Sequence, residues 1–144
     1  MDWREAALAE ATSLKPYYVE KYGWKPEVAD DGAEVIHLFV HLRGRRFPDQ
    51  EYLLRLRYQP DWQKAGRREA FVDVDDRDHA GPEFWPPQGA PLNPTYMHNG
   101  VLTPAICLRG VFGFHSVLHT ERPMEKEDAG LLHFLVELQK VMDG

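Results

Sequence analysis

Residues 35–42 read Val35-Ile36-His37-Leu38-Phe39-Val40-His41-Leu42, and every second residue from Ile36 onward is aliphatic. Successive side chains of a β-strand point to opposite faces, so this alternation indicates a strand. The residues expected on one face are Ile36, Leu38, Val40 and Leu42, and those on the other are Val35, His37, Phe39 and His41. The stretch therefore predicts a strand in a sheet that is buried on one side.

Two more alternating stretches follow at residues 52–58 and 70–75, and residues 43–49 form the first connecting loop. The side chains expected to face the core from the first of these stretches are Tyr52, Leu54, Leu56 and Tyr58. Alternation with short connections is typical of an antiparallel meander, here of three to four strands.

The charged residues of these stretches suggest a register. Arg55 and Arg57 are expected to face water, as are Asp73 and Asp75. If the registers match, these residues lie across from one another, and each pair contributes roughly a few tenths of a kcal/mol.

Helices are expected at both ends of the chain. Residues 2–14 have apolar side chains at helical spacing behind a capping Asp2, and the proline at position 16 ends that helix. Residues 16–32 are interpreted as connector and turn. Residues 124–142 predict a final helix, with acidic residues Glu125, Glu127 and Asp128 in its first turns and a buried stripe of Leu131, Phe134, Leu135, Leu138, Val141 and Met142.

Residues 79–105 are rich in proline and glycine, yet they also contain Phe84, Trp85 and Tyr96. Such aromatic content is unusual for a solvated linker, so we expect a long ordered loop packed on the body, and long ordered loops are usually functional. The predicted fold class is α+β: an N-terminal helix, an antiparallel meander, a long ordered loop and a C-terminal helix.

Length and composition limit the classes of protein to which this chain can belong. The chain has 144 residues, enough for one domain over 1–144, and its net charge of −6 argues against nucleic acid as a partner. No apolar run approaches the roughly 20 residues that span a membrane. The acidic N-terminus has no apolar signal region and the chain has a single cysteine, so we expect a cytoplasmic protein.

That cysteine, Cys107, stands in the run Met97-His98-Asn99-Gly100-Val101-Leu102-Thr103-Pro104-Ala105-Ile106-Cys107-Leu108. The run resembles the active-site stretch of ubiquitin-conjugating enzymes, where the Asn of a His-Pro-Asn tripeptide lies eight positions before a catalytic cysteine in an Ile-Cys-Leu context. Asn99 keeps that spacing, while His98 and Met97 stand at the family's Pro and His positions. The resemblance covers about residues 2–142 and is specific over 97–108.

The resemblance implies a UBC-like fold and a transferase. Cys107 would accept the carboxyl terminus of a ubiquitin-like protein as a thioester from an activating enzyme and pass it to an amine of a protein substrate. Asn99 would hold the oxyanion, a role in which one lost donor costs on the order of 3 kcal/mol, although Asn99-Gly100 is also a strong turn dipeptide. His98 is a further candidate that would tune the thiolate or simply pack.

The same resemblance implies no cofactor, since ATP is used by the activating partner. The short segment after Cys107 and Arg109 at a common Asp position look like the trimmed relatives found in bacterial ubiquitin-like operons, some of which serve antiviral defence. We predict no metal site in the chain.

Two other functions stay open. One is a cysteine hydrolase in which His98, His115 or His119 acts as base, and an imidazole about 3–4 Å from the sulfur would favour it. The other is a non-catalytic interaction module of the same fold, in which Cys107 is buried and inert.

The remaining histidines invite metal hypotheses. His37 and His41 share a strand face but lie roughly 13 Å apart, too far to chelate one ion. His115 and His119 would share a face only in a helix, and the preceding residues 112–114 favour an extended or irregular segment. A partial zinc site with Cys107 is the minor alternative.

Overall fold

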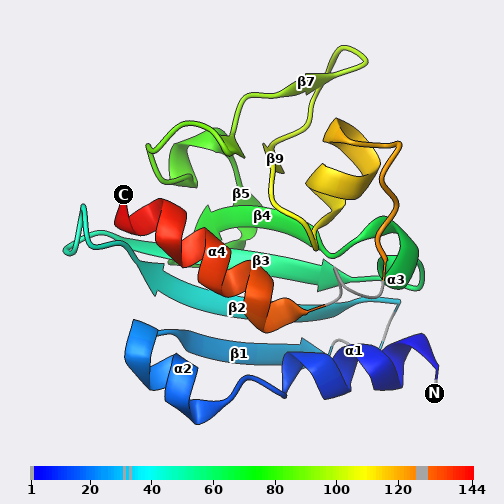
Figure 1. Cartoon of the computed structure of the whole chain (residues 1–144), viewed down its shortest axis with the longest axis horizontal. Coiled ribbons are helices and arrows are strands. Elements are labelled where there is room, and N and C mark those ends of the chain that lie inside the picture. Colours follow the sequence, from blue (N-terminus) through cyan, green and yellow to red (C-terminus); the bar gives the residue numbers. More distant parts are fainter. Residues whose placement is uncertain (1, 31, 33, 126–129) are drawn as a thin grey trace.

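The computed structural model describes residues 2–30, 32, 34–125 and 130–144. It is an α+β fold in which a five-stranded antiparallel sheet is flanked by helices from both ends of the chain (Figure 1). The sheet consists of β1 (Lys25–Asp30), β2 (Ile36–Arg43), β3 (Glu51–Tyr58), β4 (Arg68–Asp73) and β5 (Asp76–Ala80), in that spatial order. The helices are α1 (Trp3–Ala11), α2 (Pro16–Tyr22), the one-turn α3 (Trp62–Ala65) and α4 (Leu131–Asp143).

The meander is confirmed, but it has five strands where three to four were predicted. The extra strands are β1, from the segment expected to be connector and turn, and β5, which follows β4 through a hairpin. That same connector also contains α2. Pro16 starts this helix because a proline at the first helical position loses no hydrogen bond, and Gly23 ends it in the left-handed conformation at φ 70°.

The predicted charge register is wrong. Arg55 lies opposite Ala70 and Arg57 opposite Arg68, whereas Asp73 pairs with Asp76 in the next hairpin. The reason is that β4 begins earlier than expected, at Arg68. The guanidinium of Arg55 instead donates to the carbonyl oxygen of Arg77 at 3.0 Å.

The core lies between the sheet and the helices. Every expected core residue of β2 and β3 is buried, and α4 packs across this face of the sheet, as Figure 1 shows. A second, smaller cluster of Phe39, Leu53 and Val72 occupies the opposite face of the sheet, with the Arg77 guanidinium over the Phe39 ring. Both faces of the central strands are therefore partly covered.

The final helix begins at Leu131 and not at 124. Met124 and Glu125 precede it in irregular structure, and the predicted first-turn residues Glu127 and Asp128 lie outside the described residues. The apolar stripe is confirmed: all its members are buried except Val141, which is half-buried.

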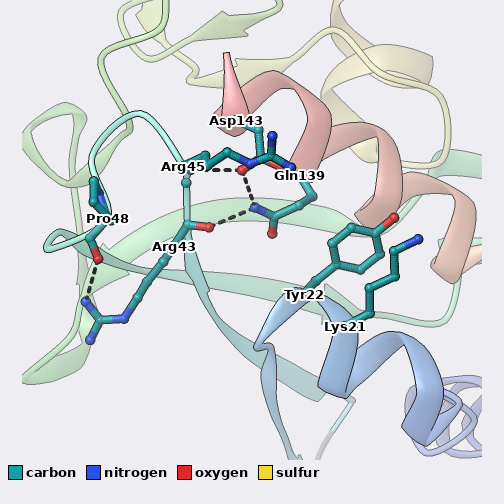
Figure 2. Close-up of a pocket in the computed structure, with 8 residues that line it drawn as sticks. Lys21, Tyr22, Arg43, Arg45, Pro48, Gln139 and Asp143 are labelled. Atoms are coloured by element: carbon teal, nitrogen blue, oxygen red, sulfur yellow. Dashed lines mark hydrogen bonds between the residues drawn. The ribbon is translucent and has the colours of Figure 1, made fainter.

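A buried glutamine fastens this helix to the sheet. Gln139 accepts a hydrogen bond from Trp24 Nε1 at 2.9 Å and donates to the carbonyl oxygen of Arg43 at 2.8 Å. Figure 2 shows Gln139 and Asp143 meeting the β2–β3 loop, where Arg45 N donates to Asp143 Oδ1 at 2.9 Å. The C-terminal helix is thus held by polar contacts as well as by its apolar stripe.

Arg67, just before β4, is fully buried and links distant parts of the chain. Its guanidinium pairs with Glu10 of α1 and donates to the carbonyl oxygen of Gly110 at 2.7 Å, with the Trp62 ring centroid 5.3 Å away. Burial by itself lowers the pKa of Arg67, but the hydrogen bonds with Glu10 and the nearby charges outweigh it, so the pKa is raised. Arg67 is therefore charged and paired in the folded protein. No described helix combines the length and apolar character needed to cross a membrane.

The Arg67–Glu10 pair yields a stability prediction. Glu10→Ala leaves a buried guanidinium without its carboxylate, so we expect the free energy of unfolding in urea to fall by about 3 kcal/mol. Glu20→Ala, at an exposed position on α2, is the control and should change it by less than about 0.5 kcal/mol. Equal losses in the two variants would contradict the assignment.

Candidate active site

Cys107 follows directly after a short strand that fixes its backbone. That strand, β9 (Ala105–Ile106), pairs antiparallel with β6 (Leu92–Asn93), and Cys107 N donates to the carbonyl oxygen of Pro91 at 2.8 Å. The predicted ordered loop is therefore built of short paired segments. Cys107 is half-buried, and this partial exposure argues against an inert core cysteine.

The segment after Cys107 forms a π-helix, η2 (Gly113–Leu118). The expectation of an extended or irregular segment here is wrong, because Gly113 packs closely against β9 and lets the chain turn immediately. A π-helix is rare and is frequently found at functional sites. Its last turn is closed by His119, whose backbone N–H donates to the carbonyl oxygen of Phe114 at 2.8 Å.

The π-helix brings His119 to the sulfur. His119 Nε2 lies 3.4 Å from Cys107 Sγ, and His119 Nδ1 lies 3.5 Å from Glu121 Oε1. The Phe114 ring packs on the imidazole with centroids 4.6 Å apart. A proton on Nδ1 faces the carboxylate and leaves Nε2 free to accept the thiol proton, which is the tautomer a general base needs.

This arrangement has the order nucleophile, base and orienting carboxylate. Glu121 is 68% exposed, so water weakens its contact with His119. The pKa of Glu121 lies below its ordinary value, mainly through a hydrogen bond from its own backbone N–H and in part through His119. A solvent-exposed carboxylate therefore lies 3.5 Å from His119 Nδ1.

Two open hollows lie near the pair, one beside Cys107 and one beside Glu121. One has a volume of about 400 Å³ and is lined by Cys107, Leu108, Arg109, Phe114, His133 and Glu137. The other, of about 200 Å³, is lined by Arg109, Phe114, Glu121, Arg122, Pro123 and Glu125. Arg109 and Phe114 line both hollows, and we call the first of them, which Cys107 lines, the Cys107 groove.

His115 has a structural place instead of a catalytic one. It is buried, its Nε2 accepts from Gly110 N at 3.0 Å, and its Nδ1 donates to the carbonyl oxygen of Arg122 at 2.7 Å. One partner is a donor and the other an acceptor, so these contacts define a neutral ring. With both nitrogens engaged, His115 serves neither as base nor as a zinc ligand.

Asn99 and His98 lie on a different piece of the structure. Met97–His98 (β7) pairs with Val101–Leu102 (β8), and the connecting Asn99-Gly100 turn has φ values of 52° and 78°. Two left-handed residues are what a tight two-residue hairpin requires. The hairpin extends away from the sheet (Figure 1), and Asn99 Nδ2 donates to His98 Nε2 at 3.4 Å.

The positive φ of Asn99 therefore shows that this residue forms part of the hairpin turn. In the described structure, neither Asn99 nor His98 has a hydrogen bond to Cys107, and neither lines the Cys107 groove. The structure brings His119, not His98, to the sulfur. The oxyanion role of Asn99 stays a prediction that requires the hairpin to fold toward the groove.

The other strand-face histidines have separate partners. His41 Nδ1 contacts Glu51, and His37 Nε2 accepts from Arg57 Nε at 3.1 Å. Within residues 2–30, 32, 34–125 and 130–144, no three His, Cys, Asp or Glu side chains come together as a metal site would need.

A buried carboxylate lies behind the site. Glu69 of β4 accepts hydrogen bonds from Ile106 N at 2.9 Å and from Gly113 N at 3.0 Å. The residue as a whole is half-buried, but its carboxyl faces inward, and burial raises its pKa from 4.5 to about 7 against the lowering effect of these N–H donors.

Sequence reasoning named His119 as one of three candidate bases, but it could not choose among them. Glu121 and Glu69 were missed. Glu121 lies two residues beyond His119, and its proximity to the imidazole depends on the fold of that segment. Glu69 stands in an ordinary strand, and its inward orientation depends on the register of β4.

Comparison with known proteins adds no relative: no protein-family model, no curated protein and no solved structure matches this chain. The chemistry of the site therefore has to be argued from its own geometry.

The pKa of Glu69 predicts a pH dependence of stability. The folded protein holds this proton more tightly than the unfolded chain, so the stabilisation is complete below about pH 4.5 and is lost as the pH rises through about 7. We expect the Glu69 contribution to the free energy of unfolding to fall by about 3 kcal/mol between pH 4 and pH 8. Urea titrations at several pH values measure it.

The neutral variant Glu69→Gln is the matched comparison, because it cannot ionise. Its unfolding free energy should decline less than that of the wild type over the same pH range. Parallel curves for the two proteins would show that Glu69 does not titrate there.

Proposed function

We propose that this protein carries an acyl group as a thioester on Cys107 and passes it to an amine, as a ubiquitin-conjugating-type transferase does, with His119 as the base. The resemblance of residues 97–108 is what favours transfer to an amine, and the 3.4 Å separation of Cys107 Sγ and His119 Nε2 supports an activated thiol, which a transferase with this base and a hydrolase both need. A thiol is a weak nucleophile until deprotonated, and an adjacent imidazole supplies that activation.

The charging step can be written in full. Cys107 gives its proton to His119 Nε2, and the thiolate attacks the carbonyl carbon of a donor thioester. The bond between that carbon and the donor sulfur breaks. The donor leaves as a thiol after taking the proton from His119, and Cys107 holds the acyl group.

The transfer step uses the same base. An amine nitrogen attacks the carbonyl carbon of the Cys107 thioester, forming the amide C–N bond, and the C–S bond breaks. His119 accepts a proton from the amine and returns it to the Cys107 sulfur. Because an amine attacks only when it is not protonated, a base 3.4 Å from the sulfur assists this step as well as charging.

The nature of the donor rests on the resemblance of residues 97–108. A ubiquitin-like protein, delivered as a thioester by an activating enzyme, has a flexible carboxyl terminus that would lie in the Cys107 groove. An open groove at the molecular surface is compatible with a macromolecular acyl donor, since a small-molecule site usually encloses most of its ligand.

The cysteine hydrolase is the second candidate, and a specific observation favours it. The imidazole within 3–4 Å of the sulfur, backed by Glu121, is the arrangement that such enzymes need. In that case water replaces the amine, and the acyl group leaves as a carboxylic acid. The two functions share Cys107 and His119, and they differ in whether an amine or water accepts the acyl group.

Charging can be tested with a defined probe, a peptide carrying a C-terminal thioester of 2-mercaptoethanesulfonate. We expect a covalent peptide adduct on the wild type that is released by excess thiol, because a thioester exchanges with thiolates. Cys107→Ala should form no adduct, and Cys107→Lys should form one that resists thiol. Adduct formation by Cys107→Ala would overturn the proposal.

The fate of the thioester separates the two candidates. Purified charged protein is mixed at pH 7 with buffer alone or with free lysine, and the products are followed by mass spectrometry. A transferase discharges faster with lysine and yields a lysine amide, and His119→Gln should slow that discharge on the order of 100-fold.

His79→Gln is the matched control, since His79 lies on β5 and is exposed. It should discharge like the wild type. Rapid release as free acid, unaffected by lysine but slowed in His119→Gln, would instead establish the hydrolase.

A further inference from the structure

We propose that Glu69 is a positioning residue for the Cys107–His119 pair, with its carboxyl holding the strand end that carries the nucleophile and the helix start that carries the base. The inference rests on the proposed function and assigns a third residue to it. Glu69 touches no reacting atom, so its action passes through the backbone of its neighbours.

The Glu69 carboxyl bonds to both elements at once, and we call this set of hydrogen bonds the Glu69 brace. Glu69 Oε2 accepts from Ile106 N at 2.9 Å and from Gly113 N at 3.1 Å, and Oε1 lies 3.0 Å from the same Gly113 N. Ile106 is the residue before Cys107, and Gly113 is the first residue of the π-helix that ends next to His119. One carboxyl thus joins the two elements that carry the reacting side chains.

Gly113 allows this close contact because it has no side chain. A Cβ at position 113 would lie 2.2 Å from Glu69 Oε2 and 2.8 Å from Ala105 Cβ, and both distances are shorter than side chains tolerate. The absence of a side chain at Gly113 lets the π-helix start against the carboxyl and against β9. The glycine in the Phe112-Gly113-Phe114 run is explained by this close approach.

Glu69 is distinguished by hydrogen bonds that reach both β9 and the start of the π-helix. β9 contains two residues and, within the described part of the chain, pairs with the equally short β6 alone, so its own ladder is weak. Three other hydrogen bonds hold the segment that contains the π-helix. Phe112 N donates to the carbonyl oxygen of Arg67 at 2.7 Å, the Arg67 guanidinium donates to that of Gly110 at 2.7 Å, and the Ser116 hydroxyl donates to that of Ala65 at 2.9 Å. None of these three bonds involves β9. Loss of the Glu69 carboxyl would leave two backbone donors unpaired and free the two elements to separate.

Separation matters because proton transfer needs a short contact. The sulfur and the imidazole nitrogen are 3.4 Å apart, and a displacement of about 1 Å removes the hydrogen bond. Glu69 is therefore expected to influence the reactivity of Cys107 only while His119 is present to receive its proton.

Alkylation by iodoacetamide provides the test, because Cys107 is the single cysteine. The thiolate displaces iodide, forming the S–C bond as the C–I bond breaks, and the thiol proton goes to His119. The rate at pH 7 is measured for intact protein by mass spectrometry, with circular dichroism confirming the fold of each variant. No acyl donor or partner is needed.

We expect His119→Gln and Glu69→Ala each to slow alkylation on the order of tenfold. Glu69→Gln should stay within about twofold of the wild type, because one amide oxygen can accept from both backbone donors. In the double variant Glu69→Ala/His119→Gln, the rate should equal that of His119→Gln alone, since the two residues act through one contact. Glu20→Gln is the control for a carboxylate far from the site.

The outcomes separate the inference from the function on which it rests. Slowing by His119→Gln with no slowing by folded Glu69→Ala overturns the positioning role and leaves the dyad intact. A Glu69→Ala effect that persists fully in the His119→Gln background also overturns it, because the effect then reaches Cys107 by another route. If His119→Gln does not slow alkylation, His119 is not the base, and both proposals are overturned.

If Glu69→Ala does not fold, Glu69→Asp replaces it in the same cycle. Its shorter side chain cannot meet both donors at once, so slowing that disappears in the His119→Gln background supports the brace. A wild-type rate in folded Glu69→Asp overturns it.

Discussion

The buried guanidinium of Arg67 is the contact on which the rest of the structure depends. It joins Glu10 on the first helix, Trp62 beside the sheet and the carbonyl oxygen of Gly110 in the loop after Cys107. A charge that is fully removed from water has to be paired, so all these partners must come together at once. The N-terminal helix and the loop next to the nucleophile are thereby held in one arrangement.

The candidate site is built on the same strand region. The carbonyl oxygen of Arg67 accepts from Phe112, and the carboxyl of Glu69 accepts from Ile106 and Gly113. Backbone donors of the two site-carrying segments thus bond to β4 and to the residue just before it, and β4 is itself part of a five-stranded sheet. This support keeps the sulfur and the imidazole 3.4 Å apart, with Cys107 lining an open groove.

Much of the fold could be predicted because it follows from local pattern. Alternation located β2 and β3 and their buried faces, and the helical stripe located α4. The pattern failed at Pro16, which was expected to end a helix over residues 2–14: α1 ends earlier, at Ala11, and Pro16 instead starts α2. It also failed at Gly113, where glycine suggested irregular structure but serves a close contact within a π-helix.

The sequence by itself determined the α+β class, the central strands and the identity of the only thiol, since these depend on side-chain period and composition. Only the tertiary structure decided that His119 and not His98 or His115 lies against Cys107, and that Glu69 points inward. The reason is that Glu69 meets partners 37 and 44 residues away through the strand register, and that a rare helical turn brings His119 back to Cys107. Neither the register of a strand nor a π-helix produces a periodic pattern in the sequence.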